Sequence, residues 1–125
     1  MPDYDYQNLS PTEFEDLTQG LLQKQLDIIF ESFTTGRDNG IDLRYSQSFA
    51  NDIIVQCKRY KDYNSLFNNL KKEVANVTKI NPSRYIVVTS VGLTPARKKI
   101  IFKLFTPYIK NTADIYGKND LNNLL

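Results

Sequence analysis

The segment from Arg84 to Thr89 constrains the fold more than any other, because nearly all of its residues are apolar or β-branched. Such a run is typical of a central strand that is buried on both faces. A second apolar strand is predicted from Ile53 to Lys58, and a helix from Asn64 to about Lys79 separates the two strands. Since a helix that connects two strands of one sheet makes them parallel, we expect a mixed α/β sheet with helices on both faces.

Caps and apolar spacing place the helices. Ser10, Pro11 and Glu13 form a capping box that begins a helix ending near Gln25, and Thr94-Pro95 begins another helix in the same way. Asn64 is the predicted N-cap of the helix between the two strands, and a last helical turn is predicted over 120–125. The residues predicted to be buried on these helices are Phe14, Leu17 and Leu21, with Leu22 at the edge, then Leu66, Phe67, Leu70, Val74 and Val77, and finally Ile100, Ile101, Leu104 and Phe105.

Three further strands are predicted around these elements. The segments 27–33 and 41–45 have strand composition and are separated by an Asn39-Gly40 turn. The segment 41–45 then forms a hairpin with the strand that starts at Ile53, and a weak strand covers 113–116. The expected sheet therefore has four to five strands, and the main elements follow the order helix, three strands, helix, strand, helix.

Length and composition indicate one globular domain over residues 1–125. The chain has 125 residues, of which 41% are hydrophobic, enough for one core and too few for two ordinary domains. No apolar run is long enough to cross a bilayer. The single Cys57 cannot form an internal disulfide, which favours a reducing compartment such as the cytoplasm, and the lack of His nearly excludes a structural zinc site.

Charge is distributed unevenly along the chain. Residues 1–51 carry three basic and nine acidic side chains, whereas residues 52–125 carry thirteen basic and five acidic ones. The basic part is where a polyanion would bind, although uneven charge is also common in ordinary proteins.

Gln56, Lys58 and Asp42 are predicted to converge. Successive side chains of a strand point to opposite faces, so Gln56 and Lys58 share one face while Cys57 takes the other. If the strand around Asp42 pairs beside them, its carboxylate can point to the same side, because Ile41 and Leu43 alternate with it. A carboxylate, an amide and an amine would then meet at the ends of two strands. The alternative is the solvent face of an edge strand.

Four segments of the chain resemble the Mrr-like branch of the PD-(D/E)xK nuclease superfamily, which has the restriction-endonuclease fold. The similarity covers almost the whole chain, and it departs from the wider superfamily at Gln56, where most members carry Asp or Glu. The segments are Phe14-Glu15, Asp38-Asn39-Gly40-Ile41-Asp42, Val55-Gln56-Cys57-Lys58-Arg59, and Val88-Thr89-Ser90 followed by Thr94-Pro95-Ala96.

This resemblance implies a metal-dependent DNA endonuclease. Phosphodiester hydrolysis needs an activated water and positive charge near the transition state, and Mg²⁺ or Mn²⁺ supplies both. Asp42, the Gln56 amide oxygen and the Cys57 backbone carbonyl are the implied ligands, and Lys58 orients or deprotonates the attacking water. Because Gln56 carries no charge, a further acid is expected in the shell. Glu15 is the candidate, with a solvated helix residue as the alternative.

Basic and aromatic residues near these positions are candidates for binding double-stranded DNA. Arg59, Tyr60 and Lys61 follow the strand that carries Lys58. Arg97, Lys98 and Lys99 begin a helix, and the free amides at a helix N-terminus favour phosphate. The alternative for these three is a solvated helix face.

The resemblance also implies a biological context. Mrr-like domains occur at the N-terminus of antiviral STAND NTPases and other defence proteins, and the apolar Leu124-Leu125 end suggests a fragment of a longer protein with C-terminal regulatory NTPase or sensor domains. Cutting both strands usually requires two active sites, so a homo-oligomer is expected when the protein is active. Two other functions stay open: an inactive nucleic-acid or protein-binding module, and a Holliday-junction-resolvase-like nuclease.

Overall fold

The computed structural model describes residues 6–27, 31–32, 43–46 and 52–125. Within these ranges no helix is both long and apolar enough to cross a membrane. The elements, in chain order, are η1 (Tyr6–Asn8), α1 (Pro11–Leu26), β1 (Glu31–Ser32), β2 (Leu43–Ser46), β3 (Asp52–Lys58), α2 (Tyr63–Ile80), β4 (Arg84–Thr89), α3 (Pro95–Leu104), η2 (Thr112–Asp114), β5 (Ile115–Tyr116) and α4 (Lys118–Leu124).

The strands form one mixed sheet in the order β1-β2-β3-β4-β5. Strand β2 is antiparallel to β1 and β3, and its Leu43 lies opposite Val55. Strand β4 is parallel to β3 and β5, and its Thr89 lies opposite Lys58. The α/β class and the parallel pairing of β3 with β4 around a crossing helix are therefore as predicted from the sequence.

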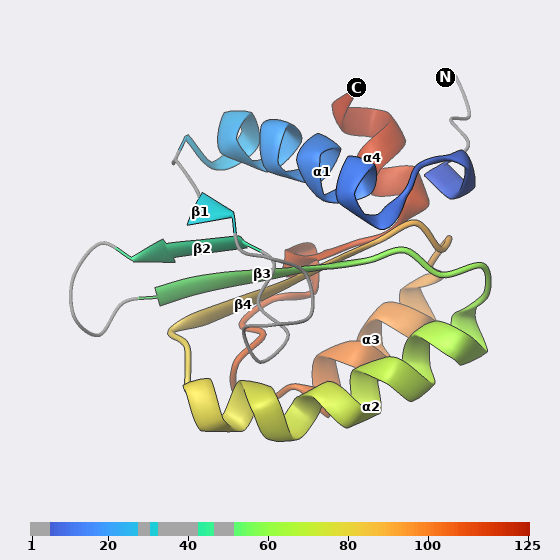
Figure 1. Ribbon diagram of the computed structural model, residues 1–125. Helices are drawn as coiled ribbons and strands as arrows, with labels where there is room; N and C mark the ends of the chain where they lie inside the picture. Colours follow the sequence, from blue (N-terminus) through green and yellow to red (C-terminus); the bar gives the residue numbers. More distant parts are fainter. Residues whose placement is uncertain (1–5, 28–30, 33–42, 47–51) are drawn as a thin grey trace.

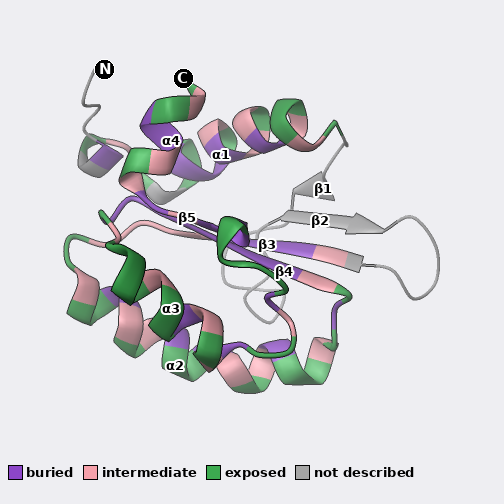
Figure 2. Ribbon diagram, turned by 180° about the vertical axis from the view of Figure 1, so that it is seen from behind, coloured by how far each residue is buried: buried purple, intermediate pink, exposed green. Residues whose placement is uncertain are grey.

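Helices cover both faces of this sheet (Figure 1). Helices α1 and α4 lie on one side, called here the α1 face, and α2 and α3 lie on the other, called the α2 face. Strand β4 is buried along almost its whole length, which its run of apolar residues predicted (Figure 2). A strand covered on both faces needs apolar side chains in both directions.

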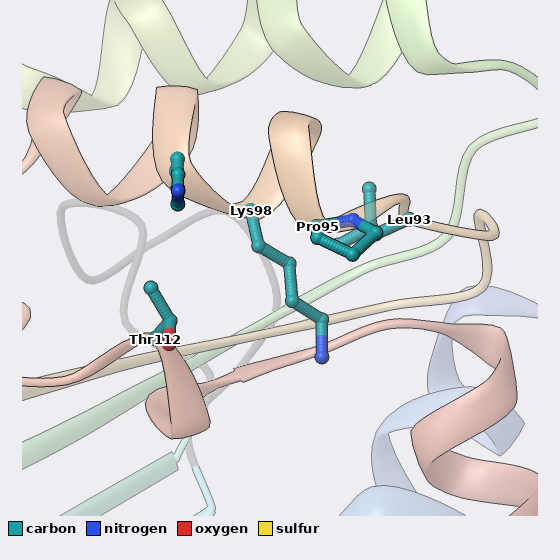
Figure 3. A pocket seen from close by; sticks show the side chains of 5 residues that line it. Leu93, Pro95, Lys98 and Thr112 are labelled. Carbon is teal, nitrogen blue, oxygen red and sulfur yellow. The ribbon is translucent and has the colours of Figure 1, made fainter.

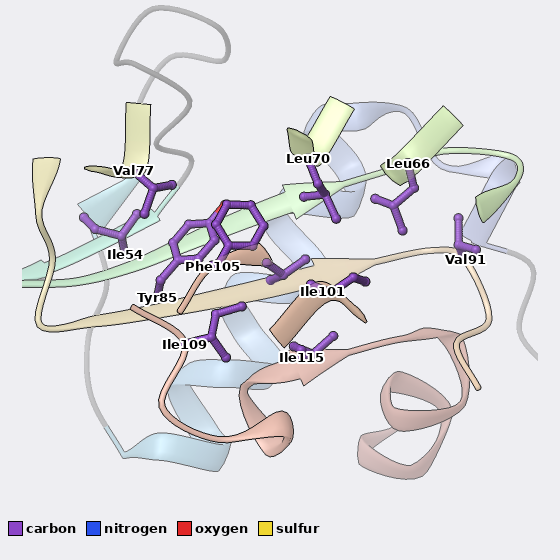
Figure 4. Packing of buried hydrophobic residues seen from close by; sticks show 11 residues of the cluster. Ile54, Leu66, Leu70, Val77, Tyr85, Val91, Ile101, Phe105, Ile109 and Ile115 are labelled. Atoms are coloured by element: carbon purple, nitrogen blue, oxygen red, sulfur yellow. The ribbon is translucent and has the colours of Figure 1, made fainter. Parts of the chain in front are cut away.

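The core of the α2 face gathers side chains from β3, β4, both helices and the segments that follow them (Figure 4). Tyr85 and Phe105 pack with their ring centroids 4.8 Å apart near its centre. The other fully or almost fully buried members are Ile54, Leu66, Leu70, Val77, Val87, Val91, Ile101, Ile109 and Ile115. This packing anchors β3 and β4 against α2.

One predicted boundary and one predicted buried position at the N-terminal side are wrong. Helix α1 ends with Asp27 as its C-cap in a left-handed conformation (φ 56°), so the strand predicted from residue 27 does not begin there. The described part of that strand is Glu31–Ser32. On α1, Leu22 is fully buried, whereas Leu21 is only partly buried, so the helix is rotated slightly from the predicted stripe.

Two helix starts and the burial of one residue differ from the prediction in the second part of the chain. The N-cap of helix α2 is Asp62 and not Asn64, so the helix begins earlier than predicted. The Asp62 side chain accepts a 2.8 Å hydrogen bond from the Ser65 amide. Helix α4 starts at Lys118 and not at residue 120. Ile100 is 46% exposed, because the short helix α3 buries mainly the side of Ile101.

Candidate active site

Gln56 and Lys58 lie on the α2 face of β3, as the alternation of the strand predicted. Ile54 belongs to the core of the α2 face, whereas Val55 and, partly buried, Cys57 belong to the core of the α1 face. Both Gln56 and Lys58 make hydrogen bonds to a side chain of α2. The amide and the amine are therefore side by side, and Cys57 faces away from them into a core, as predicted.

Glu73 of α2 joins these two side chains. Its Oε2 accepts a 2.6 Å hydrogen bond from Gln56 Nε2 and a 3.0 Å charge-assisted hydrogen bond from Lys58 Nζ. All three side chains are largely shielded from solvent, Glu73 being 8% and Gln56 1% exposed. A buried carboxylate and a buried ammonium each need a partner, and here each is the partner of the other.

Tyr85 of β4 fixes the orientation of the Gln56 amide. Its fully buried hydroxyl donates a hydrogen bond to Gln56 Oε1. An ionised carboxylate only accepts hydrogen bonds, so the amino group of Gln56 must face Glu73 and its oxygen must face Tyr85. The result is a connected polar path from Tyr85 through Gln56 to Glu73 and Lys58.

The carboxyl ends of β3 and β4 hold Lys58 in place. The Lys58 backbone oxygen accepts hydrogen bonds from Thr89 Oγ1 at 2.7 Å and from the Ser90 amide at 3.3 Å. Ser90 Oγ in turn accepts from the Tyr60 amide at 3.1 Å and donates to the Tyr60 oxygen at 2.9 Å. Because these bonds tie both strand ends together, the backbone under the Lys58 amine is rigidly placed.

The charge of Glu73 reaches beyond the pair. Partial burial raises the pKa of the Tyr60 hydroxyl, and the nearby negative charge of Glu73 raises it further. Tyr60 therefore stays a neutral hydrogen-bonding group over the whole physiological pH range. It lies directly after the strand end, next to the carboxylate.

Glu73 was not predicted from the sequence. Its position on α2 is within the buried stripe formed by Leu66, Leu70 and Val77, where the predicted stripe had Val74. An acid at an apolar position of a helical stripe indicates a paired or functional group. This pattern could have identified Glu73 from the sequence. Val74 is only partly buried, and Phe67 likewise.

Glu15 lies on α1 and is more deeply buried than the predicted rim position. It is 7% exposed and follows Phe14, which is fully buried in the core of the α1 face. Helix α1 packs against β3 from the face opposite to Glu73 (Figure 1). Its role as a metal ligand stays a prediction. Asp38 and Asp42 lie outside the described residues, and Leu43, which follows Asp42, pairs with Val55.

The basic residues predicted to bind DNA form two groups. Arg59 and Lys61 flank Tyr60 just beyond β3, where Lys61 is exposed and Arg59 is half-buried. At the start of α3, the Arg97 guanidinium lies 4.5 Å above the ring of Tyr63, and Lys98 Nζ forms a 2.7 Å ion pair with Asp120 of α4.

Helix α3 borders a pocket that two of these lysines line. Lys98 and the exposed Lys99 line it together with Leu93, Pro95 and Thr112, and Lys98 extends along it (Figure 3). The Thr94 side chain caps α3 by accepting from the Arg97 amide at 3.2 Å, so one of the free amides of this helix end is already used.

The oxygen donors near Lys58 suit a hard cation but are too few alone. Within the described parts of the chain, no three His, Cys, Asp or Glu side chains come together as a metal-binding group. Glu73 contributes one carboxylate, and a Mg²⁺ site needs at least one more protein oxygen besides water. Asp42 is the predicted source of that oxygen.

Comparison with known proteins finds one matching family model and one relative. The family model Mrr_cat, described as restriction endonuclease, matches residues 6–103. Uncharacterized protein y4cD of Sinorhizobium fredii is 37% identical over 124 residues, which is 98% of this chain and 19% of that protein. The chain thus spans about a fifth of the length of this relative. No solved structure gives a significant match.

Proposed function

From the premise that the chain belongs to the Mrr_cat restriction endonuclease family, we propose that it is a Mg²⁺-dependent DNA endonuclease. The observation that carries the proposal is the Lys58 amine, held beside the Glu73 carboxylate at the joined ends of β3 and β4. Family membership points to a nuclease of the restriction type. In this cluster a charged amine and a carboxylate meet, largely shielded from solvent, on one face of the sheet.

The reaction requires a water to attack phosphorus while negative charge builds up on the phosphate oxygens. A bound Mg²⁺ or Mn²⁺ would supply Lewis acidity and lower the pKa of that water. Asp42, the Cys57 carbonyl and an oxygen from the side-chain cluster around Gln56 on the α2 face would hold the ion. Glu15 is a further candidate. Lys58 Nζ donates hydrogen bonds to the water or to a phosphate oxygen and so opposes the developing charge.

Double-stranded DNA is the proposed substrate. Arg59, Tyr60 and Lys61 continue from the strand that carries Lys58, and Lys99 and Arg97 lie at the start of α3. Basic side chains that contact phosphates release bound cations, so the affinity for DNA should fall with salt by a slope of about 0.9 per phosphate contacted. A flat salt dependence would mean that these residues face protein and not DNA.

The wider context is also part of the proposal. The chain matches about a fifth of its longer relative, which supports a place within a multidomain protein. We place it as an effector in anti-phage defence or restriction, with C-terminal regulatory NTPase or sensor domains and with a homo-oligomer as the active form. A cytoplasmic location fits the presence of a single cysteine, which cannot form an internal disulfide.

Cleavage of supercoiled plasmid tests this function. Lys58→Met should lower the rate of Mg²⁺-dependent nicking by about 10²–10⁴-fold, the usual range for a positioned proton-transfer or charge-stabilising group. Lys79→Met, an exposed lysine in the last turn of α2, should cleave like the wild type. Chelation of the metal should abolish cleavage in both.

Two results would point to other functions. Equal cleavage by wild type and Lys58→Met would indicate a contaminating nuclease and favour a non-catalytic binding module. A strong preference for four-way junctions over linear duplex would favour a junction resolvase.

A further inference from the structure

Gln56 and Glu73 form one hydrogen-bonded unit, in which Gln56 makes orienting hydrogen bonds and Glu73 carries the negative charge. Gln56 Oε1 is directed to the buried hydroxyl of Tyr85, and Gln56 Nε2 is directed to Glu73. The Gln56 side chain is almost completely enclosed. Its oxygen is therefore engaged by Tyr85 within the core of the α2 face, and its amino group faces the carboxylate that also binds Lys58.

We propose that Glu73, and not Gln56, is the oxygen ligand that the α2 face contributes to the divalent cation, and that Gln56 is the positioning residue that orients it. This inference rests on the proposed function, since the cation is the one that the cleavage reaction requires. It assigns a ligand on α2, whereas the sequence pointed to the strand.

The geometry places Glu73 where such a ligand has to be. Its Oε2 lies 3.0 Å from Lys58 Nζ, so the carboxylate and the catalytic amine share one location. A carboxylate has about four acceptor sites. In the described residues Glu73 accepts from Gln56, from Lys58 and, at a long 3.4 Å, from Asn76 Nδ2 to Oε1. Oε1 thus retains capacity for a cation.

The identity of residue 56 follows from this arrangement. A carboxylate at position 56 would lie 2.6 Å from the Glu73 oxygen, and two negative charges at that distance repel strongly. A glutamine instead accepts from Tyr85 and donates to Glu73 at the same time. The negative charge that the strand lacks is then supplied from the helix, and hard cations prefer this charged oxygen to an amide.

Calorimetric titration with Ca²⁺ and with Mn²⁺ tests the inference without relying on cleavage. Glu73→Gln should weaken cation affinity by at least about tenfold, and Gln56→Met by about 10–100-fold, the range for groups that orient a ligand. Lys58→Met should bind cations as well as the wild type or better, because a neighbouring positive charge is removed. Glu13→Gln is the matched control, since it removes a charge from another helix while Gln preserves the capping box.

A merely structural role for Glu73 makes a different prediction. If Glu73 only neutralises Lys58, cation affinity is unchanged in Glu73→Gln while the wild type still cleaves DNA; that result overturns the inference and leaves the proposed function standing. A wild type that neither binds cations nor cleaves DNA overturns both.

A double variant covers the case in which Glu73→Gln does not fold. Lys58→Met/Glu73→Gln removes both partners of the ion pair, so no unpaired charge is left buried. Its cation affinity is compared with that of Lys58→Met alone, after circular dichroism has shown that both are folded. A tenfold or greater difference supports Glu73 as a ligand, and equal affinities overturn it.

Discussion

The two faces of the sheet use the same two strands in different ways. On the α1 face, β3 and β4 present Val55, Ile86 and Val88, which pack against apolar residues of α1 such as Phe14 and Leu22. On the α2 face the same strands present Ile54 and Val87 together with Gln56, Lys58 and Tyr85. One face therefore contributes mainly burial, and the other carries a connected polar cluster within an apolar core.

This difference shows how one short strand can serve stability and chemistry together. Because side chains alternate along β3, the residues that face α1 can be apolar and pack in a core while the residues between them are polar and face α2. The division is not complete, since α1 brings Glu15 and Thr18 to the buried side, and Thr18 Oγ1 has no hydrogen-bond partner in the described residues. The predictions below test how far the two faces are independent.

The largest stability effect is expected on the α1 face. Leu22→Ala should lower the free energy of unfolding by about 2–5 kcal/mol, because it removes a fully buried side chain and leaves a cavity. Urea denaturation measures this change. Gln25→Ala, exposed on the same helix, should stay within about 0.5 kcal/mol of the wild type. The comparison breaks down if Leu22→Ala also reduces cleavage by the molecules that remain folded.

A smaller effect is expected from the polar cluster. Glu73→Leu should cost about 1–3 kcal/mol of unfolding free energy, since it leaves the amino group of Gln56 and the Lys58 ammonium without their shared acceptor. Combining it with Lys58→Met should recover part of the loss, with a coupling energy of about 0.5–3 kcal/mol in urea denaturation. Strict additivity of the two substitutions would contradict a direct Lys58–Glu73 contact.

An ion pair that links the two layers should matter less. Lys98 of α3 and Asp120 of α4 come from helices on opposite faces and remain partly exposed. Lys98→Met should change the unfolding free energy by only about 0–1 kcal/mol, because solvent screens such pairs. Lys99→Met on the same helix is the reference. A loss as large as that of Glu73→Leu would mean that this link couples the two faces.

The smallest effect concerns the N-cap of α2. Hydrogen bonds from the backbone and side chain of Ser65 hold the pKa of Asp62 below its usual value of 3.8. Its contribution to stability is therefore fully present above about that value and is lost as the pH falls through the lowered pKa.

Substitution of the cap should reveal this pH dependence. Asp62→Asn should be close to the wild type at pH 7, since Asn is also a good cap, and should lose slightly less stability on acidification. Urea midpoints measured at neutral and at acid pH check this, with Asp16→Asn, an exposed acid within α1, as the reference. A larger acid-induced loss in Asp62→Asn than in the wild type would contradict the expected sign.

The part of the candidate site that lies on β3 was predictable because it depends on local periodicity. Alternation along β3 was sufficient to place Gln56 and Lys58 on one face and Cys57 on the other, and the caps at Ser10 and Thr94 located two helix starts. Glu73 was missed because its pairing with Lys58 joins residues fifteen positions apart on different elements. A helical period says that residue 73 is on the inner side of α2 but not what it meets there.

The sequence by itself indicated the main strands and helices, their order, the faces on which Gln56, Cys57 and Lys58 lie, and the family, because these follow from spacing, caps and short motifs within one element. The tertiary structure alone decided which acid lies beside Lys58 and in which direction the Gln56 amide points. Those contacts depend on how α2 and Tyr85 pack across the sheet, and packing is settled by the fit of many distant side chains at once.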